Sequence, residues 1–98
     1  MASVEVADAA REDLDQLIRT LSLPADTRDR VKHALLPLAR FPQLGPELTG
    51  RWRGFRFVLG PWRWIIIVYA HLDDKDRVVV VAMQDARSAE PVGRAIRA

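Results

Sequence analysis

The sequence predicts an α+β domain: a short N-terminal strand, then a helical hairpin, then a three-stranded antiparallel meander packed against the helices. Three observations support this fold class. Apolar residues recur at helical spacing over two segments of the first 40 residues. Runs of β-branched and aromatic residues follow between residues 50 and 85. Turn residues separate these runs, namely Gly60-Pro61 after the first and residues 73–76 after the second.

The first 40 residues contain the strand and the two helices. Residues 3–6 are β-prone, and we expect them to form the first strand. The first helix is expected over residues 7–21, where six apolar side chains fall on one stripe: Ala7, Ala10, Leu14, Leu17, Ile18 and Leu21. Its outer face carries Arg11, Asp15 and Arg19 at intervals of four, which predicts solvated ion pairs along the helix.

The second helix is expected to begin near Asp26 or Thr27, because either side chain can cap a helix N-terminus. Its apolar stripe consists of Val31, Ala34, Leu35 and Leu38. Pro37 lies inside this stripe and is expected to kink the last turn or to end the helix early.

A two-residue type II′ hairpin is predicted at Gly60-Pro61, because this turn requires Gly at its first central position. Leu59 then pairs with Trp62. One face of the meander collects the larger apolar side chains, and we expect the helices to cover it: Phe55, Phe57, Leu59, Trp62, Trp64, Ile66 and Val68. The opposite face collects Trp52, Arg56, Val58, Arg63, Ile65, Ile67 and Tyr69.

In this register Arg56 and Arg63 are diagonal neighbours within side-chain reach. Two guanidiniums held close together repel each other unless an anion or a carboxylate lies between them, so the pair is a candidate anion site. Two solvated arginines on an exposed sheet face are the alternative. Trp52 and Tyr69, on the same face, either stack on nucleic-acid bases or pack along the strands.

Composition limits the remaining alternatives. The 98 residues, 49% of them hydrophobic, suffice for one core, so we expect one domain over residues 1–87 and a tail over residues 88–98 that is a short helix or flexible. No apolar run is long enough to span a membrane. The first residues lack the pattern of a signal peptide and the chain has no cysteine, so a cytoplasmic protein without disulfides is expected.

Charge is unevenly distributed along the chain. Residues 24–64 hold eight basic and three acidic residues, a net charge of +5, which indicates an anionic partner. His33 and His71 are not spaced as metal ligands, and the acidic turn lacks the glycine and the later glutamate of a calcium loop. We therefore expect neither a metal nor a cofactor.

The order of elements and a set of residues spread over positions 3–87 resemble the RelE/ParE superfamily of type II toxin–antitoxin toxins. The residues that carry the resemblance are Asp13-Leu14 and Leu17, Leu35, Leu38, Phe41-Pro42 and Gly45, Leu48 and Gly50, Phe55-Arg56, Gly60-Pro61-Trp62-Arg63, Val68-Tyr69, and Arg87. The resemblance implies growth arrest that a cognate antitoxin neutralises. RelE-like members cleave mRNA in the ribosomal A site without a metal, whereas ParE-like members poison DNA gyrase.

The resemblance also implies site residues. Arg63 and Arg56 match basic residues that stabilise the scissile phosphate, Arg87 resembles the late arginine of the family, and Glu47 resembles the loop glutamate that acts as general base in some members. Arg51, Arg53, Trp52 and Tyr69 are the expected RNA-binding residues. No tyrosine or histidine follows residue 71, however, and ribonuclease members often carry one there.

On this basis the leading hypothesis is a ribosome-dependent mRNA endonuclease. A gyrase inhibitor that acts by binding and a non-toxic, antitoxin-binding relative are the alternatives. The expected partners are an acidic, amphipathic antitoxin that matches the basic middle segment, together with the ribosome and mRNA or, in the alternative, DNA gyrase.

Overall fold

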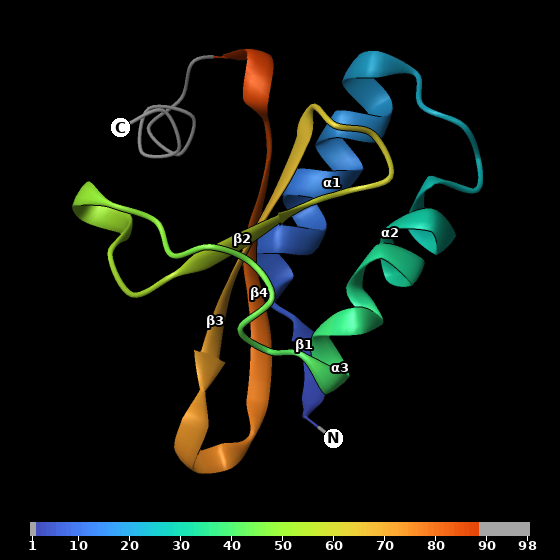
Figure 1. Cartoon of the computed structure of the whole chain (residues 1–98). Coiled ribbons are helices and arrows are strands. Elements are labelled where there is room, and N and C mark those ends of the chain that lie inside the picture. The colour runs from blue at the N-terminus through green and yellow to red at the C-terminus, as the bar shows by residue number, and fades with distance from the viewer. Residues whose placement is uncertain (1, 89–98) are drawn as a thin grey trace.

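One strand, three helices and three further strands follow one another along residues 2–88, the part of the chain that the computed structural model describes (Figure 1). The elements are β1 (Ser3–Val6), α1 (Asp8–Leu21), α2 (Thr27–Leu35), α3 (Pro37–Arg40), β2 (Arg56–Leu59), β3 (Ile65–Leu72) and β4 (Arg77–Asp85). The predicted α+β class is confirmed. The predicted tail, residues 88–98, lies outside the described residues apart from residue 88, which ends a short 3₁₀ turn.

The four strands form one sheet in the order β1-β4-β3-β2. Strands β2, β3 and β4 pair antiparallel, as the predicted meander requires. Strand β1 lies parallel to β4, with Ser3 opposite Arg77 and Val6 opposite Val80. The first and last strands are therefore neighbours, and β1 forms one edge of the sheet.

The helices begin and end close to the predicted residues. Helix α1 ends at Leu21, and Ser22 follows in the left-handed conformation with φ 51°. Before α2, the Thr27 hydroxyl donates a hydrogen bond of 2.6 Å to the carbonyl of Pro24. As predicted, Pro37 ends the second helix, because α2 stops at Leu35 and the proline starts the short helix α3.

The predicted ion pairs along α1 are replaced by a pair between helices. The carboxylate of Asp15 accepts a hydrogen bond from Arg28 of α2, rather than from Arg11 or Arg19 on its own helix. Both partners are exposed enough for water to screen the pair, so it orients the two helices without adding much stability.

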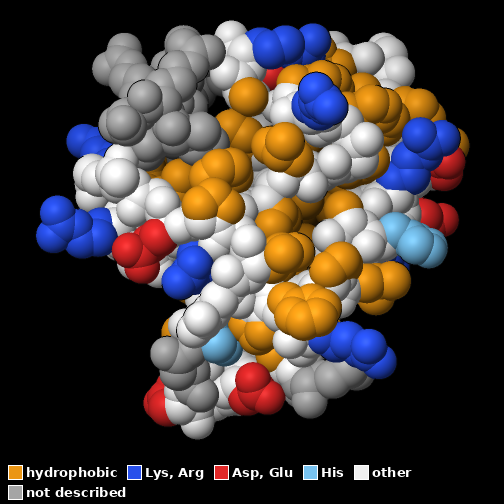
Figure 2. Space-filling view, in the orientation of Figure 1, with side chains coloured by type: hydrophobic (Ala, Val, Ile, Leu, Met, Phe, Trp, Pro, Cys, Tyr) orange, Lys and Arg blue, Asp and Glu red, His pale blue; other side chains and the backbone are white. Residues whose placement is uncertain are grey.

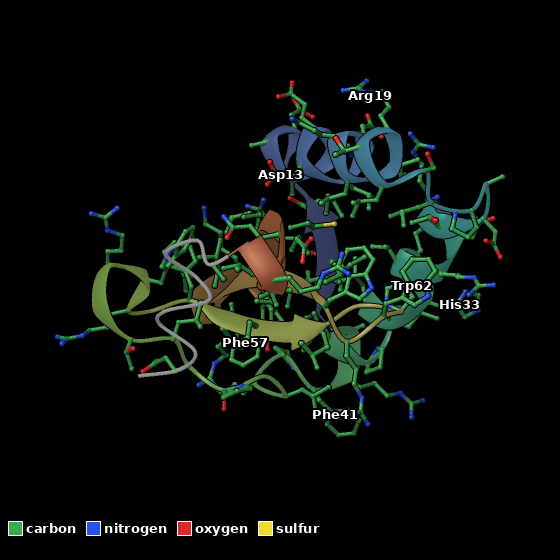
Figure 3. The ribbon with its side chains drawn as sticks, turned by 90° about the horizontal axis from the view of Figure 1, so that it is seen from above. Asp13, Arg19, His33, Phe41, Phe57 and Trp62 are labelled. Carbon is green, nitrogen blue, oxygen red and sulfur yellow. The ribbon has the colours of Figure 1, made fainter. Side chains whose placement is uncertain are left out.

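The helices cover the face of the sheet opposite to the predicted one. Ile65, Ile67 and Tyr69 of β3 are buried against residues of α1, α2 and α3, and Val58 of β2 packs beside them. The prediction was wrong because residues 65–68 are apolar at every position, so alternation could not distinguish the two faces. Figure 3 shows α1 on one side of the sheet when the molecule is viewed from above.

The other face carries a second, smaller core. Leu48, Ile66, Val68 and Ala82 are buried there, and Trp52, Phe55 and Phe57 pack against them. The chain before β2 covers this face, since Leu48 donates a hydrogen bond to the carbonyl of Phe55 and the amide of Phe57 donates one to Pro46. This segment also shields the outer edge of β2.

The predicted hairpin register was also wrong. Leu59 pairs with Ile66 and not with Trp62, so the connection between β2 and β3 consists of residues 60–64. Gly60 does not have the positive φ of a type II′ turn. Its amide donates to the carbonyl of Ile65, and the amide of Ile65 donates back to Trp62, which closes a wider turn. The partner of Leu59 is thus shifted along β3 by an even number of residues from the predicted one. Side chains alternate between the two faces, so each strand residue still shares a face with the neighbours predicted for it.

A β-bulge in β4 re-aims the end of that strand. Val68 pairs with Ala82 and Tyr69 with Val80, which leaves Val81 as the extra residue. Met83 consequently joins Val80 on the helix-covered face. Strand β1 ends before this point, and the carboxylate of Asp13 in α1 accepts a hydrogen bond of 3.1 Å from the Met83 amide instead.

Candidate functional site

The connection between β2 and β3 presents Arg63 at the surface. Its side chain is exposed and makes no hydrogen bond or ion pair with another described residue. Trp62 and Trp64 on either side of it are half-buried and pack against the helix-covered core. The packing role predicted for the two tryptophans is therefore confirmed, and their anchoring leaves Arg63 directed away from the core.

Two arginines complete a stack on these tryptophans. The rings of Trp62 and Trp64 are nearly parallel, with an angle of 13° between their planes and 6.0 Å between their centroids. Arg30 of α2 lies 5.6 Å from the Trp62 centroid, and Arg87 lies 4.3 Å from that of Trp64. Figure 3 shows Trp62 beside α2, near His33. This cation–π stack joins α2, the connection and the turn after β4.

Arg87 is held from a second side by an acidic neighbour. Its guanidinium donates to both carboxylate oxygens of Asp85, at 3.0 and 3.1 Å. The hydrogen bond from Arg87 lowers the pKa of Asp85 below its usual value, and the carboxylate in turn raises the pKa of Arg87. A phosphate would have to displace this carboxylate to bind Arg87 in the same bidentate manner.

Arg56 lies in a different place, against the segment that precedes β2. Its guanidinium donates a hydrogen bond of 2.8 Å to the carbonyl of Gly45, while the Gly45 amide donates to the hydroxyl of Tyr69 at 3.0 Å. Gly45 must be glycine here, because a Cβ atom would lie 1.9 Å from the carbonyl oxygen of Phe57. Arg56 is therefore part of a clamp that fixes this segment to β2 and β3.

Tyr69 is completely buried, which rules out the predicted stacking on an RNA base. Burial raises the pKa of its phenol, and this effect is partly offset by the Gly45 amide and by the charge of Arg56. Trp52 is half-buried, with its ring edge-on to Phe55 at 5.7 Å, so it packs within the second core. Sequence reasoning placed Tyr69 on the exposed face because it assigned the helices to the wrong side. It placed Trp52 beside Tyr69 because it extended β2 over residue 52, which lies in a 3₁₀ turn before that strand.

The residues predicted for the functional site therefore lie in separate parts of the structure. Arg56 and Arg63 do not form a diagonal pair, because Arg56 lies opposite Tyr69 and Arg63 lies in the connection beyond the end of β2. Leu59, the last residue of β2, is three residues beyond Arg56. At about 3.3 Å per residue, roughly 10 Å of strand therefore separates Arg56 from the start of the connection that carries Arg63. Glu47 pairs with Arg56 through the backbone and is exposed. Arg51 and Arg53 are exposed on the turn before β2.

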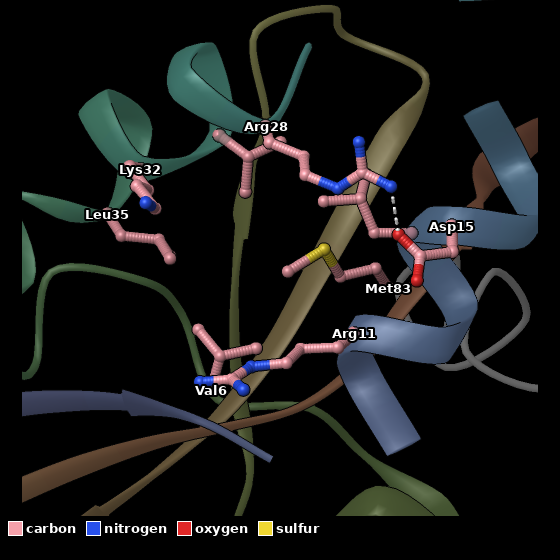
Figure 4. A pocket seen from close by; sticks show the side chains of 9 residues that line it. Val6, Arg11, Asp15, Arg28, Lys32, Leu35 and Met83 are labelled. Carbon is pink, nitrogen blue, oxygen red and sulfur yellow. Dashed lines mark hydrogen bonds and ion pairs between the residues drawn. The ribbon is translucent and has the colours of Figure 1, made fainter. Parts of the chain in front are cut away.

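A feature that the sequence reasoning missed lies between α1 and α2, above the end of β1. Two adjoining hollows of about 440 and 450 Å³ share Val6, Arg11, Lys32 and Leu35, and we call them together the β1 groove. Figure 4 shows Arg11 reaching from α1 toward Val6, with Arg28 and Lys32 on the opposite wall. The signal in the sequence was that Arg11 of α1 and Lys32 of α2 each lie at the border of the apolar stripe of their helix.

Apolar and basic side chains are interspersed over the face of the molecule that Figure 2 shows. Leu36, Phe41 and Leu44 are each more than half exposed, which is unusual for large apolar side chains in one region of a small protein. Among residues 2–88 no cluster of three potential metal ligands occurs. None of the described helices has the length and hydrophobicity needed to cross a bilayer.

Comparisons with known proteins agree on one family. The model of the family described as ParE toxin of type II toxin–antitoxin system, parDE, matches residues 4–89. A search of curated proteins by sequence finds no match.

Solved structures share the fold at low sequence identity. The Mycobacterium tuberculosis RelBE2 toxin–antitoxin complex contains a chain with a TM-score of 0.69 and 21% identity, over 86% of this chain and 96% of that one. The isolated Escherichia coli RelE toxin gives 0.65 and 15%, over 99% and 97%. A metal-bound toxin from Helicobacter pylori gives 0.66 and 17%, over 92% and 100%. Because the family model covers nearly the whole chain, the protein belongs to the ParE toxins of type II toxin–antitoxin systems.

Proposed function

We propose that this toxin arrests growth by binding a protein target, DNA gyrase in the mode of ParE-like members, rather than by cleaving mRNA. The observation that carries the proposal is the separation of the residues predicted for cleavage. Arg56 is held by the Gly45 carbonyl and Arg87 by Asp85, and Tyr69, which was expected to bind RNA, is buried.

Cleavage of RNA without a metal requires a general base, a cation for the phosphate and a general acid within hydrogen-bond reach of one phosphodiester. Of the predicted groups, Glu47, Arg63 and Arg87 are exposed, but Glu47 lies before β2, Arg63 after β2 and Arg87 after β4, where Asp85 holds it. A binding mechanism needs no such convergence. It needs an exposed side chain on a rigid support, and Arg63 between two anchored tryptophans fits that requirement.

Ribosome-dependent mRNA cleavage is the second candidate. It is favoured by the exposed arginines Arg51, Arg53 and Arg63, which together suit a phosphate backbone. In that mechanism the ribosome supplies most of the positioning, Arg63 contacts the phosphate and Glu47 acts as base.

Two measurements on cells that express the protein from a tightly repressed promoter, and one on the purified protein, separate the candidates. Gyrase poisoning predicts an SOS response with intact transcripts, and the purified protein should inhibit supercoiling by purified gyrase. Cleavage predicts cuts in primer extension at the ribosomal A site, together with unimpaired supercoiling. That second pattern would refute the binding mechanism, and harmless overproduction of folded protein would refute toxicity itself.

A cognate antitoxin is the proposed partner in both mechanisms. The product of a small acidic reading frame adjacent to this gene should bind the toxin and restore growth. Failure of that product to form a complex would remove it as the antitoxin.

A further inference from the structure

The loop after α3 exposes two large apolar side chains to water. Phe41 and Leu44 are 59% and 56% exposed. They border a shallow hollow of about 570 Å³, which residues 40–44 line on one wall and His71 and Asp76 on the other. Figure 3 shows Phe41 at the margin of the molecule, with its ring directed outward on the side away from α1. We call the residues that line this hollow the α3 loop surface.

The backbone of this loop is fixed at both ends. The amide of Phe41 donates to the carbonyl of Pro37, and the amide of Leu44 donates to that of Phe41, both at 2.9 Å. Gly45 follows directly and is held by the Tyr69 hydroxyl and the Arg56 guanidinium. An ordered turn therefore presents the two apolar side chains, so a partner that binds there orders little additional backbone. Apolar side chains exposed together on a rigid support are typical of an interface.

The charges beside the hollow indicate which partner fits. Arg40 lies on one wall and Asp76 on the other, and neither side chain has an ion pair or hydrogen bond with another described residue. A nucleic acid or an acidic protein would be attracted by Arg40 and repelled by Asp76. A second copy of the chain, related by a twofold axis through the hollow, places Arg40 of each copy opposite Asp76 of the other. Both charges are then paired.

We propose that the free toxin forms a twofold-symmetric homodimer through the α3 loop surface. Phe41 of each copy packs in the hollow of the other, and the two Arg40–Asp76 pairs fix the orientation. The net charge of +2 per chain opposes association only weakly. Two apolar side chains and one ion pair per copy make a small interface, with an expected dissociation constant of about 1–100 µM. The inference depends neither on the target nor on the antitoxin.

Sedimentation velocity of the purified full chain, from about 1 to about 300 µM, measures the association. The weight-average mass should rise from that of one chain toward that of two. Phe41→Ser and Leu44→Ser should each weaken the dimer about tenfold, because each substitution removes two buried side chains per dimer. Leu59→Ser is the matched control and should leave association unchanged, since Leu59 is 47% exposed but lies at the end of β2.

An exchange of charges tests the symmetry of the contact. Arg40→Glu brings two carboxylates together at each pair, and Asp76→Lys brings two cations together, so either variant alone should dimerise about tenfold more weakly at low salt. An equimolar mixture of the two variants restores opposite charges at both pairs and should associate about as strongly as wild type. Only a contact in which position 40 of one copy faces position 76 of the other predicts this rescue.

The remaining outcomes overturn the proposal. A chain that stays monomeric at the highest concentration does so, and loss of growth arrest in Phe41→Ser would then assign the surface to the target. Dimerisation that the serine variants at positions 41 and 44 leave intact also does so, as does a mixture no stronger than its components. Asp76 has a positive φ of 48°, so Asp76→Lys adds backbone strain. If that variant does not fold, the three serine variants and Arg40→Glu decide.

Discussion

Replacement of Tyr69 by phenylalanine separates a structural role from a role in the site. The Tyr69 hydroxyl accepts the hydrogen bond of the Gly45 amide, and both groups are buried. Phenylalanine keeps the ring and removes the acceptor, which leaves that amide unpaired. An unpaired buried donor costs about 1–3 kcal/mol. For a chain of 98 residues each kcal/mol corresponds to a decrease of roughly 4–8 °C in melting temperature.

Alkaline pH gives the same residue a second signature. Because burial raises the pKa of Tyr69, the unfolded chain loses its phenolic proton first as the pH rises above about 10. Stability is complete below that pH and falls by up to about 1.4 kcal/mol per pH unit until the folded phenol also ionises. Tyr69→Phe should lack this component.

The assay is urea unfolding followed by tryptophan fluorescence at neutral and alkaline pH, together with growth arrest at a temperature where both proteins are folded. Tyr69 is the only tyrosine, so its ultraviolet titration in the wild type is unambiguous. We expect lower stability and retained toxicity. Retained stability with lost toxicity would show that Tyr69 contacts the target and would refute the structural role.

Three further substitutions test the support of Arg63 and of β4. Arg63→Ala should abolish growth arrest in the plating assay and leave antitoxin affinity within twofold, whereas persistent toxicity would remove Arg63 from the mechanism. Trp62→Ala should lower the free energy of unfolding by about 2–3 kcal/mol, because a half-buried ring and its contact with Arg30 are lost, and chemical denaturation measures this. Asp13→Ala should cost about 1–2 kcal/mol by leaving the Met83 amide unpaired, and an unchanged denaturation midpoint would show that water replaces the carboxylate.

The elements could be predicted from the sequence because local physics decides them. The apolar spacing of residues 7–21 determined α1, the ring of Pro37 determined the end of α2, and the β-branched runs determined β3 and β4. The ordered set of residues in these elements also indicated the toxin superfamily to which the matching family model belongs.

Only the tertiary structure decided which face the helices cover and where each arginine lies. Residues 65–68 are apolar on both faces, so the choice depended on packing partners far away in the sequence. The five-residue connection between β2 and β3 brings Trp62 and Trp64 into a stack with Arg30 and Arg87, contacts with distant segments that no local turn rule contains. The position of β1 at the edge of the sheet likewise follows from its parallel pairing with β4, a contact across more than 70 residues of chain.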